Sequence, residues 1–350
     1  LMIQKPIIVQ RLLILLVFVA GTVILLNWTS SSAAESEKCF ADIDNVGAPK
    51  LEDVLLSSKK PTPGKSIFFH ETSCARASGV HLSAREACAV ESAALMNPHL
   101  DVFVLFASPR VFSNTTATPI IDALNSYSNI YLRNINLWTY AAGTPIYEWL
   151  KSGKLFESKY VISHTSDFLR YLTLWKWGGT YLDLDVIVKT NLETLKSNFA
   201  GAESEKFVAA GVLNFDSYGF GHQVAELCLR HFQINFDGDE WGNNGPGVIT
   251  KVLQEICKTK STKLMSKERC FGFRVFPKEK FYAVRWWNWN HFFENKYLQS
   301  AISQTNDSAI VHVWNKHSKN KVINVGAPVA YGKLAEKFCP KVYRSCGEYF

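Results

Sequence analysis

Short apolar runs alternate with amphipathic runs between residues 66 and 188. The apolar runs have the length of strands, and the amphipathic runs have the spacing of helices that bury one face. The predicted strands are 66–70, 102–107, 130–132 and 181–188, and the predicted helices are 84–97, 119–127, 146–150 and 164–177. This alternation predicts an α/β fold with a mostly parallel sheet and helices on both faces.

Beyond residue 195 the sequence becomes richer in aromatic residues and glycine. Two amphipathic runs in this part, 224–232 and 248–257, predict two further helices. We therefore divide the folded chain into two halves, residues 66–200 and residues 201–350.

Another apolar stretch lies close to the N-terminus. Residues 12–26 are almost entirely apolar, and extension to Trp28 gives 17 residues, the short end of what spans a bilayer. Lys5 and Arg11 precede it, which predicts a signal anchor that keeps the N-terminus cytosolic and sends the rest of the chain into the lumen. A signal peptide cleaved near Ala34 is the alternative. The predicted parts are a cytosolic tail (1–11), a transmembrane segment (12–28) and a stem (29–65).

Composition fits a large folded protein. The 350 residues are 47% hydrophobic and 13% aromatic, which is enough for one large domain or two coupled lobes. The formal net charge is +7, with a mild concentration of basic residues in the C-terminal tail, which we interpret as a solvated face. The chain has neither zinc-finger spacing nor an arginine-rich arm, so we expect no nucleic-acid partner.

The eight cysteines include no Cys-x-x-Cys pair, which favours disulfides in an oxidising lumen over metal or redox clusters. Two pairs are close in sequence, Cys257 with Cys270 and Cys339 with Cys346, and we predict that these are two of the disulfides. Other cysteines could be free and buried. Asn114 and Asn306 begin sequons that could accept N-glycans.

The most informative chemistry is a pair of aspartates in the last predicted strand, which we place at the carboxyl ends of the strands of the sheet, where ligands gather. Asp183 and Asp185 stand one residue apart, so their side chains leave an extended backbone on the same side and can converge on one point. Such a pair suits Mn²⁺ or Mg²⁺, which is often shared between protein carboxylates and substrate phosphates. A chance surface turn is the other interpretation, but carboxylates rarely end a buried strand without a partner. Gly178 and Gly179 add backbone that can approach a ligand closely.

Four motifs carry a family resemblance. They are Phe-Phe-His-Glu-Thr-Ser at 68–73, Ser-Asp-x-x-Arg-Tyr with Gly-Gly-x-Tyr-Leu-Asp-x-Asp at 166–185, Trp-Gly-Asn-Asn-Gly-Pro at 241–246, and Val-His-Val-Trp-Asn-Lys at 311–316. Over residues 64–345 the chain resembles the DXD-containing retaining glycosyltransferases, the family of lactosylceramide 4-alpha-galactosyltransferases and alpha-1,4-N-acetylglucosaminyltransferases. The resemblance implies a GT-A-like fold. It also implies transfer of a hexose or N-acetylhexosamine, galactose favoured, from a UDP-sugar in alpha-1,4 linkage to a glycosphingolipid.

The resemblance further implies roles for single residues. Asp167 and Arg170 would contact the donor, and their spacing places them with Tyr171 on one helical face, although a surface ion pair has the same spacing. Tyr181 resembles a donor-contacting tyrosine, and a core aromatic fits equally well. Asn244 would present a polar group near the anomeric carbon, unless it only caps the following helix.

His312 belongs to the late His-x-Trp element of the family and would be a third metal ligand with Asp183 and Asp185; a core histidine is the alternative. Asp239 and Glu240 are the obvious carboxylates for a covalent mechanism, but they do not match the family's pattern. We therefore prefer attack by the acceptor hydroxyl on the front face of the sugar, beside the leaving phosphate.

The tryptophans at positions 286, 287 and 289 have two interpretations. Aromatic faces stack on pyranose rings, so they could form an acceptor platform, or they could pack between two lobes.

These inferences describe a single-pass Golgi membrane enzyme with a lumenal catalytic domain, a UDP-sugar donor and a glycolipid or glycan acceptor. Homo-oligomerisation stays open. A membrane-anchored carbohydrate-binding protein without catalysis would explain the tryptophans but not the aspartates. A metal-dependent phosphohydrolase would explain the aspartates but usually needs more acidic and histidine ligands.

Overall fold

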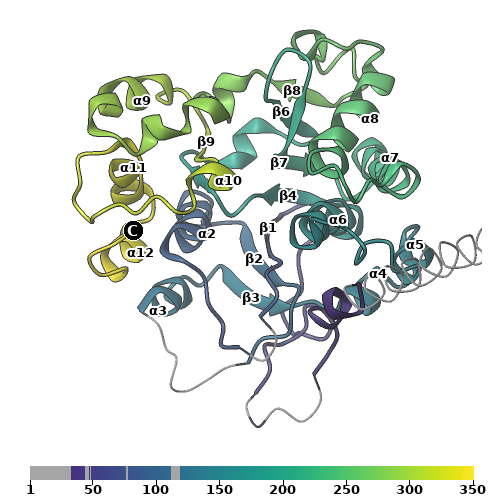
Figure 1. Ribbon diagram of the computed structural model, residues 1–350. Coiled ribbons are helices and arrows are strands. Elements are labelled where there is room, and N and C mark those ends of the chain that lie inside the picture. Colours follow the sequence, from purple (N-terminus) through teal and green to yellow (C-terminus); the bar gives the residue numbers. More distant parts are fainter. Residues whose placement is uncertain (1–32, 44–46, 48, 76–77, 112–118) are drawn as a thin grey trace, which may run out of the picture.

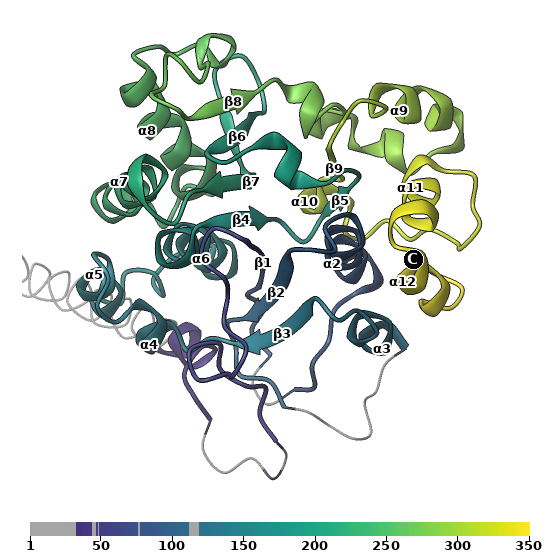
Figure 2. The same ribbon diagram turned by 180° about the vertical axis from the view of Figure 1, so that it is seen from behind.

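The computed structural model describes residues 33–43, 47, 49–75, 78–111 and 119–350 (Figures 1 and 2). The predicted cytosolic tail, the predicted transmembrane segment and the sequon at Asn114 lie outside these residues. Within the described part of the chain, no helix is both long and apolar enough to cross a bilayer.

A seven-stranded sheet forms the centre of the molecule, in the order β3-β2-β1-β4-β7-β6-β8. Its strands are β1 (Ser66–Glu71), β2 (Asp101–Phe106), β3 (Ile130–Asn134), β4 (Gly179–Leu182), β6 (Phe199–Ala202), β7 (Val208–Phe215) and β8 (Arg274–Phe276). The first four strands in this order run parallel, as do β6 and β8, whereas β7 is antiparallel to both of its neighbours. The predicted mostly parallel sheet is confirmed, and it contains strands from both halves of the chain.

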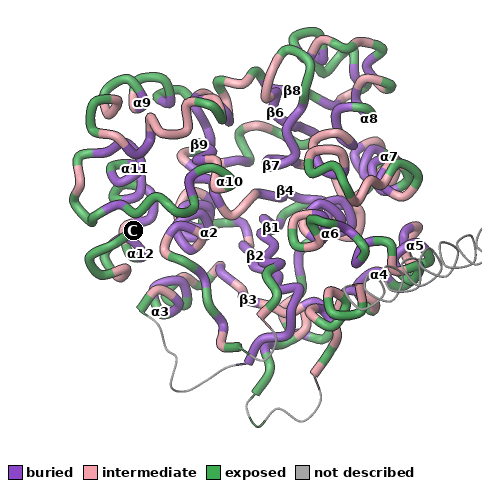
Figure 3. Tube along the Cα trace, in the orientation of Figure 1, coloured by how far each residue is buried: buried purple, intermediate pink, exposed green. Residues whose placement is uncertain are grey.

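Helices cover both faces of the sheet, as predicted (Figures 1 and 2). One face carries α2 (Ala84–Met96), α3 (Pro119–Asn125), α11 (Ala330–Phe338) and α12 (Pro340–Ser345), and the other carries α4 (Leu137–Ala141), α5 (Tyr147–Lys151), α6 (Val161–Trp177), α7 (Gly219–Asn235) and α8 (Val248–Cys257). Strand β1 shows how the two cores meet. Ile67 and Phe69 enter one core and Phe68 the other, so the strand is buried throughout (Figure 3).

The predicted strand 181–188 is wrong as a single element. Strand β4 ends at Leu182, and β5 (Val186–Val188) pairs with β9 (Ile310–His312) in a separate two-stranded antiparallel sheet. The link between them is fixed at both ends: the N–H of Asp183 donates to the carbonyl of Gly211 at 2.9 Å, and the carbonyl of Asp185 accepts from the N–H of Val313 at 2.9 Å. The two aspartates therefore lie where the chain passes from one sheet to the other.

Three disulfides join described residues: Cys39–Cys74, Cys88–Cys339 and Cys257–Cys270. The predicted pairing of Cys257 with Cys270 is confirmed, and the predicted pairing of Cys339 with Cys346 is wrong. Cys339 lies between α11 and α12, which pack against α2, and this packing brings it to Cys88 of α2. Cys346 and the buried Cys228 are free thiols.

A buried carboxylate also fixes the contact between α2 and α12. Glu91 of α2 is fully buried and accepts hydrogen bonds from the backbone N–H groups of Lys341 and Val342, at 2.9 and 2.7 Å. These groups lie in the first turn of α12, where backbone donors have no partner within the helix. Glu91 therefore caps α12 and fixes the C-terminal helices on the sheet.

Loss of the Cys88–Cys339 disulfide should destabilise the protein, because it closes a loop of 251 residues in the unfolded chain. We expect Cys339→Ser to lower the free energy of unfolding by about 2–5 kcal/mol, measured by urea denaturation without reductant. The matched control Cys346→Ser removes a free thiol and should change the free energy by less than about 0.5 kcal/mol. Equal destabilisation by the two variants would contradict the pairing.

Candidate active site

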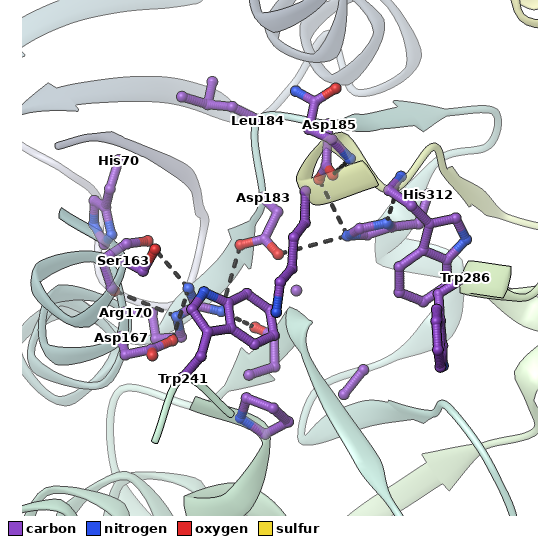
Figure 4. A pocket seen from close by; sticks show the side chains of 18 of the residues that line it. His70, Ser163, Asp167, Arg170, Asp183, Leu184, Asp185, Trp241, Trp286 and His312 are labelled. Carbon is purple, nitrogen blue, oxygen red and sulfur yellow. Dashed lines mark hydrogen bonds and ion pairs between the residues drawn. The ribbon is translucent and has the colours of Figure 1, made fainter. Parts of the chain in front are cut away.

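A cavity of about 470 Å³ opens at the carboxyl ends of β1 and β4 (Figure 4). His70 reaches it from β1, Asp167 and Arg170 from α6, and Asp183 and Asp185 from the link that follows β4. The carboxyl ends of parallel strands are where ligands gather in sheets of this class. The cavity is therefore the candidate active site.

Asp183, Asp185 and His312 converge in this cavity (Figure 4). Each offers one ligand atom, and the three atoms lie within 4.8 Å of one another. The Nε2 atom of His312 lies 3.1 Å from Asp185 Oδ1 and 3.5 Å from Asp183 Oδ2. The antiparallel pairing of β5 with β9 brings His312 here, because it places His312 opposite Val186.

Each of the three side chains is held by a hydrogen bond on its far side. Asp183 Oδ1 accepts from the hydroxyl of Tyr181 at 2.7 Å, and Asp185 Oδ2 accepts from the N–H of Asn315 at 2.7 Å. His312 Nδ1 accepts from the N–H of Trp314 at 3.2 Å. The remaining oxygens and Nε2 are thereby directed at one another, as the outer contacts of a metal site direct its ligands.

The charges of the three groups are coupled. Burial raises the pKa of Asp183, but Arg170 and His312 outweigh it, so this pKa lies below its ordinary value. Burial, together with repulsion from Asp183, raises the pKa of Asp185. Burial lowers the pKa of His312, yet the two carboxylates outweigh it and the pKa is raised. Two acids this close need positive charge between them.

Gly211 leaves room beside these side chains. A Cβ atom at this position would lie 2.5 Å from Asp183 Oδ2 and 3.2 Å from His312 Nε2. Two carboxylates and one imidazole suit a divalent transition metal such as Mn²⁺. The donor atoms and the space kept free by Gly211 both fit a metal ion.

The α6 face presents an ion pair to the same cavity. Arg170 lies 3.0 Å from Asp167 and 3.4 Å from Asp183, donates to the carbonyl of Ala210 at 2.9 Å, and lies over the ring of Tyr181. The Asp167 and Arg170 side chains are each only 8% exposed. Asp167 and Arg170 thus form a buried ion pair rather than the surface pair that the same spacing allowed. Through Arg170 this pair connects α6 to Asp183. Tyr171 instead donates to the carbonyl of Gly245 at 2.6 Å.

Three predicted residues take positions away from the cavity lining. Gly178 and Gly179 have positive φ angles of 63° and 84°, and a Cβ atom on either would collide with backbone, at Ser217 and at Ser66. Gly178 lets the end of α6 approach the loop that follows β7, and Gly179 lets β4 approach β1. Asn244 is fully buried and bonds to the backbone of Asp237 and to His164. Its position suits a structural role before α8 rather than contact with a sugar.

Several cavity residues were not predicted from the sequence. His70 Nδ1 and Tyr282 Oη are buried without a hydrogen-bond partner among the described residues, and both side chains line the cavity. Glu203 is a half-buried carboxylate there, and burial raises its pKa. The motif 68–73 was the available signal for His70. Glu203 and Tyr282 have no local signature, because distant parts of the chain bring them in.

Aromatic side chains form the mouth of the cavity. Trp286 is 42% exposed and stacks on His317, with 5.3 Å between the ring centroids, and Trp241 carries the Lys316 ammonium 3.3 Å from its ring centroid. Trp289, by contrast, packs against the core. Packing against the core therefore accounts for Trp289, and the acceptor platform stays a prediction that now concerns Trp286.

The comparisons agree with this geometry. Residues 83–202 match the family model of the glycosyltransferase sugar-binding region containing the DXD motif, and residues 217–346 match the alpha 1,4-glycosyltransferase conserved region. The lactosylceramide 4-alpha-galactosyltransferase of Mus musculus is 32% identical over 330 residues, which cover 93% of this chain and 87% of the relative. The alpha-1,4-N-acetylglucosaminyltransferase of Homo sapiens is 27% identical over 297 residues, covering 83% of this chain and 82% of the relative.

Among solved structures, the galactosyltransferase LgtC in complex with donor and acceptor sugar analogs is similar with a TM-score of 0.37 and 17% identity, covering 79% of this chain and 95% of the other.

Filling the space at Gly211 should impair metal binding. The methyl group of Gly211→Ala would displace the Asp183 carboxylate, so we expect Mn²⁺ affinity, measured by electron paramagnetic resonance titration, to fall by about tenfold or more, or about 1.4 kcal/mol. The control is Gly242→Ala, whose added methyl meets no atom within 4 Å. Wild-type Mn²⁺ affinity in Gly211→Ala would count against the site.

Asp167 predicts a pH dependence of stability. Burial raises the pKa of its carboxyl group from the ordinary 3.8 to about 6, although Arg170 opposes the rise. Protonation therefore favours the folded state, and this contribution is present below about pH 4 and lost as the pH rises through about 6. Because Asp167→Asn removes the titration, the stability of the variant relative to the wild type should rise between pH 4 and 7, by at most about 3 kcal/mol. Denaturation curves across this range test it, and a flat difference would contradict it.

Proposed function

The chain belongs to the alpha-1,4-glycosyltransferase family, and on this premise we propose that it transfers galactose from UDP-galactose, in alpha-1,4 linkage, to the terminal sugar of a glycosphingolipid. Galactose is favoured because identity to the galactosyltransferases, 32% for Mus musculus and 29% for Homo sapiens, exceeds the 27% identity to the N-acetylglucosaminyltransferase of Homo sapiens. One observation carries the proposal: Asp183, Asp185 and His312 converge beside the Asp167–Arg170 pair in a single cavity.

The donor diphosphate would bind beside the three converging side chains. Asp183, Asp185 and His312 would hold the metal ion, and Mn²⁺ suits the histidine better than Mg²⁺, which prefers oxygen ligands alone. When bound, the ion supplies Lewis-acid stabilisation of negative charge on the departing diphosphate.

Two positively charged side chains of the protein, Arg170 and Lys316, would help to bind the donor diphosphate. Arg170 is held in place by two aspartates, whereas Lys316 lies over Trp241 and has no acidic partner among the described residues. Burial lowers the pKa of Lys316, and a phosphate within reach would favour its charged form. Lys316 is therefore free to turn from the indole ring to the donor. Asp167 would accept hydrogen bonds from the sugar hydroxyls and so orient the ring.

The arrangement also bears on stereochemistry. Asp239 and Glu240, the carboxylates that the sequence offered for a covalent mechanism, do not line the cavity, and Asp239 pairs with Lys159 at the surface. We infer retention through front-face attack, with the acceptor hydroxyl passing its proton to the leaving phosphate oxygen. Trp286 at the mouth would stack on the acceptor sugar.

The proposed setting is the lumen of the Golgi, with the chain held by residues 12–28 as a single-pass anchor. Three disulfides support an oxidising compartment. A glycolipid acceptor also requires an enzyme that works at a membrane.

The function is tested by incubating the full-length protein with a panel of UDP-sugars and neutral glycolipids and assigning the product linkage by NMR. We expect an alpha-1,4-linked galactose from UDP-galactose in the presence of Mn²⁺ and none in excess chelator. Asp185→Asn removes one negative ligand and should lower kcat/KM by at least about 100-fold.

The matched control is Asp239→Asn, which alters an exposed aspartate outside the cavity and should keep wild-type turnover. Full activity of Asp185→Asn, with an unchanged unfolding temperature, would rule out the proposed metal site. Transfer of another sugar with an intact metal dependence would overturn galactose alone.

A further inference from the structure

The hydroxyl of Tyr282 is a buried polar group that the proposed donor binding does not use. Tyr282 is 1% exposed and lines the cavity, yet its hydroxyl has no hydrogen-bond partner among the described residues. A buried hydroxyl without a partner is unfavourable, and native proteins keep few of them. The ring itself is fixed by β6, because a Cβ atom added at Gly201 would lie 2.8 Å from Tyr282 Cε2.

Glu203 is a second polar group of this kind in the same cavity. It follows β6 directly, two residues after Gly201, and is half-buried. Its backbone N–H donates to the Phe207 carbonyl at 2.9 Å, whereas its carboxylate forms neither a hydrogen bond nor an ion pair with a described residue. Burial raises the pKa of Glu203, and His312 is close enough to oppose the rise. The fold therefore keeps an unpaired carboxylate near a site that already contains two aspartates.

An aromatic wall extends from Tyr282 towards the mouth of the cavity. The ring centroid of Trp314 lies 5.7 Å from that of Tyr282, and its indole N–H donates to the Val284 carbonyl at 2.8 Å. Trp314 has a left-handed backbone with φ of 59°, which is unfavourable for a bulky residue, so the fold holds this ring at the cavity against backbone strain. Trp286 continues the wall at the mouth. Aromatic rings suit the apolar face of a sugar, whose hydroxyl groups then need polar partners.

This wall lies on the side of the cavity away from α6. In Figure 4, Arg170 lies on one side of Asp183, whereas His312 and Trp286 lie on the other. The ring centroid of Tyr282 is 5.4 Å from that of His312, which places Tyr282 on the same side as Trp286. The donor sugar is assigned to the α6 side, so the polar groups of the opposite side are left for the acceptor.

We propose that Tyr282 and Glu203 bind hydroxyl groups of the acceptor sugar next to the one that reacts. This inference rests on the proposed function and assigns the acceptor part of the same cavity. A carboxylate accepts strong hydrogen bonds from hydroxyl groups, and the Tyr282 hydroxyl can donate to a sugar oxygen. The acceptor thereby supplies the partners that both groups lack, and its attacking hydroxyl is held beside the donor.

Acceptor kinetics of two conservative variants test the proposal. Glu203→Gln keeps the size of the side chain and removes its charge, and Tyr282→Phe removes only the hydroxyl. With saturating UDP-galactose and Mn²⁺, we expect each variant to raise the KM for lactose about fivefold or more, the effect of one hydrogen bond lost. The affinity for UDP in the presence of Mn²⁺, measured by calorimetry, should be unchanged, because neither residue is assigned to the donor.

Each variant has a matched control outside the cavity. Glu205→Gln changes an exposed glutamate that pairs with Lys263, and Tyr331→Phe changes a fully buried tyrosine. Both controls should keep the wild-type KM for lactose.

Two further measurements separate acceptor binding from a structural role. Glu203→Gln and Tyr282→Phe each alter a polar group without a partner, so their unfolding temperatures should equal or exceed that of the wild type. Lactose analogues that lack one hydroxyl beside the reacting one should be poorer acceptors for the wild type. For one of these analogues the penalty should be smaller in Glu203→Gln, because the contact is already weakened from the protein side.

The possible failures of this inference and of the proposed function differ. An active wild type with an unchanged lactose KM in both variants, or variants that unfold at a lower temperature, would overturn the acceptor assignment alone. Loss of kcat in Glu203→Gln at an unchanged lactose KM, or weaker binding of an unreactive fluorinated UDP-galactose, would place Glu203 against the donor and also overturn it. Absence of transfer by the wild type from every UDP-sugar would refute the proposed function, and this inference with it.

Discussion

The site depends on one constraint: two carboxylates are held together where the chain crosses from one sheet to another. Asp183 is still bonded to β7 through its N–H, and Asp185 is already bonded beyond β9 through its carbonyl. This crossing, rather than the alternation of a strand, makes their side chains converge. Because β9 pairs with β5 immediately after the crossing, the same connection delivers His312.

Two carboxylates held this close repel one another, and the surrounding residues offset part of this repulsion. Arg170 lies against Asp183, and the hydroxyl of Tyr181 and the N–H of Asn315 each satisfy one carboxylate oxygen. These contacts leave one oxygen of each aspartate facing His312, with the space beside them kept open by Gly211. The pKa of Asp185 stays raised despite this support. A further positive charge is what the arrangement lacks, and a divalent cation would supply it.

The sequence alone was sufficient to predict those helices and strands whose determinants lie close together in the chain. Helix α2 follows a capping box at Ser83, with Glu86 completing it. The alternation of strands and helices up to residue 177 was readable from periodicity, except for the short helix α4 (Leu137–Ala141), which was not predicted. The non-local features were not readable. The antiparallel β7, the pairing of β5 with β9 and the Cys88–Cys339 disulfide join segments that are far apart in sequence. His312 was suggested by the family resemblance alone, and Gly211 has no local signature at all. The motif around Asn244 placed this residue near the sugar, whereas in the structure its side chain is fully buried and does not line the cavity.

We propose that Asp183, Asp185 and His312 bind a cation together with a nucleotide diphosphate. The most direct test is an anomalous difference map from crystals of the protein grown with MnCl₂ and UDP. We expect one strong manganese peak between Asp183, Asp185 and His312, next to the bound diphosphate. UDP bound in the cavity with no peak between these side chains, or a manganese peak elsewhere, would contradict it.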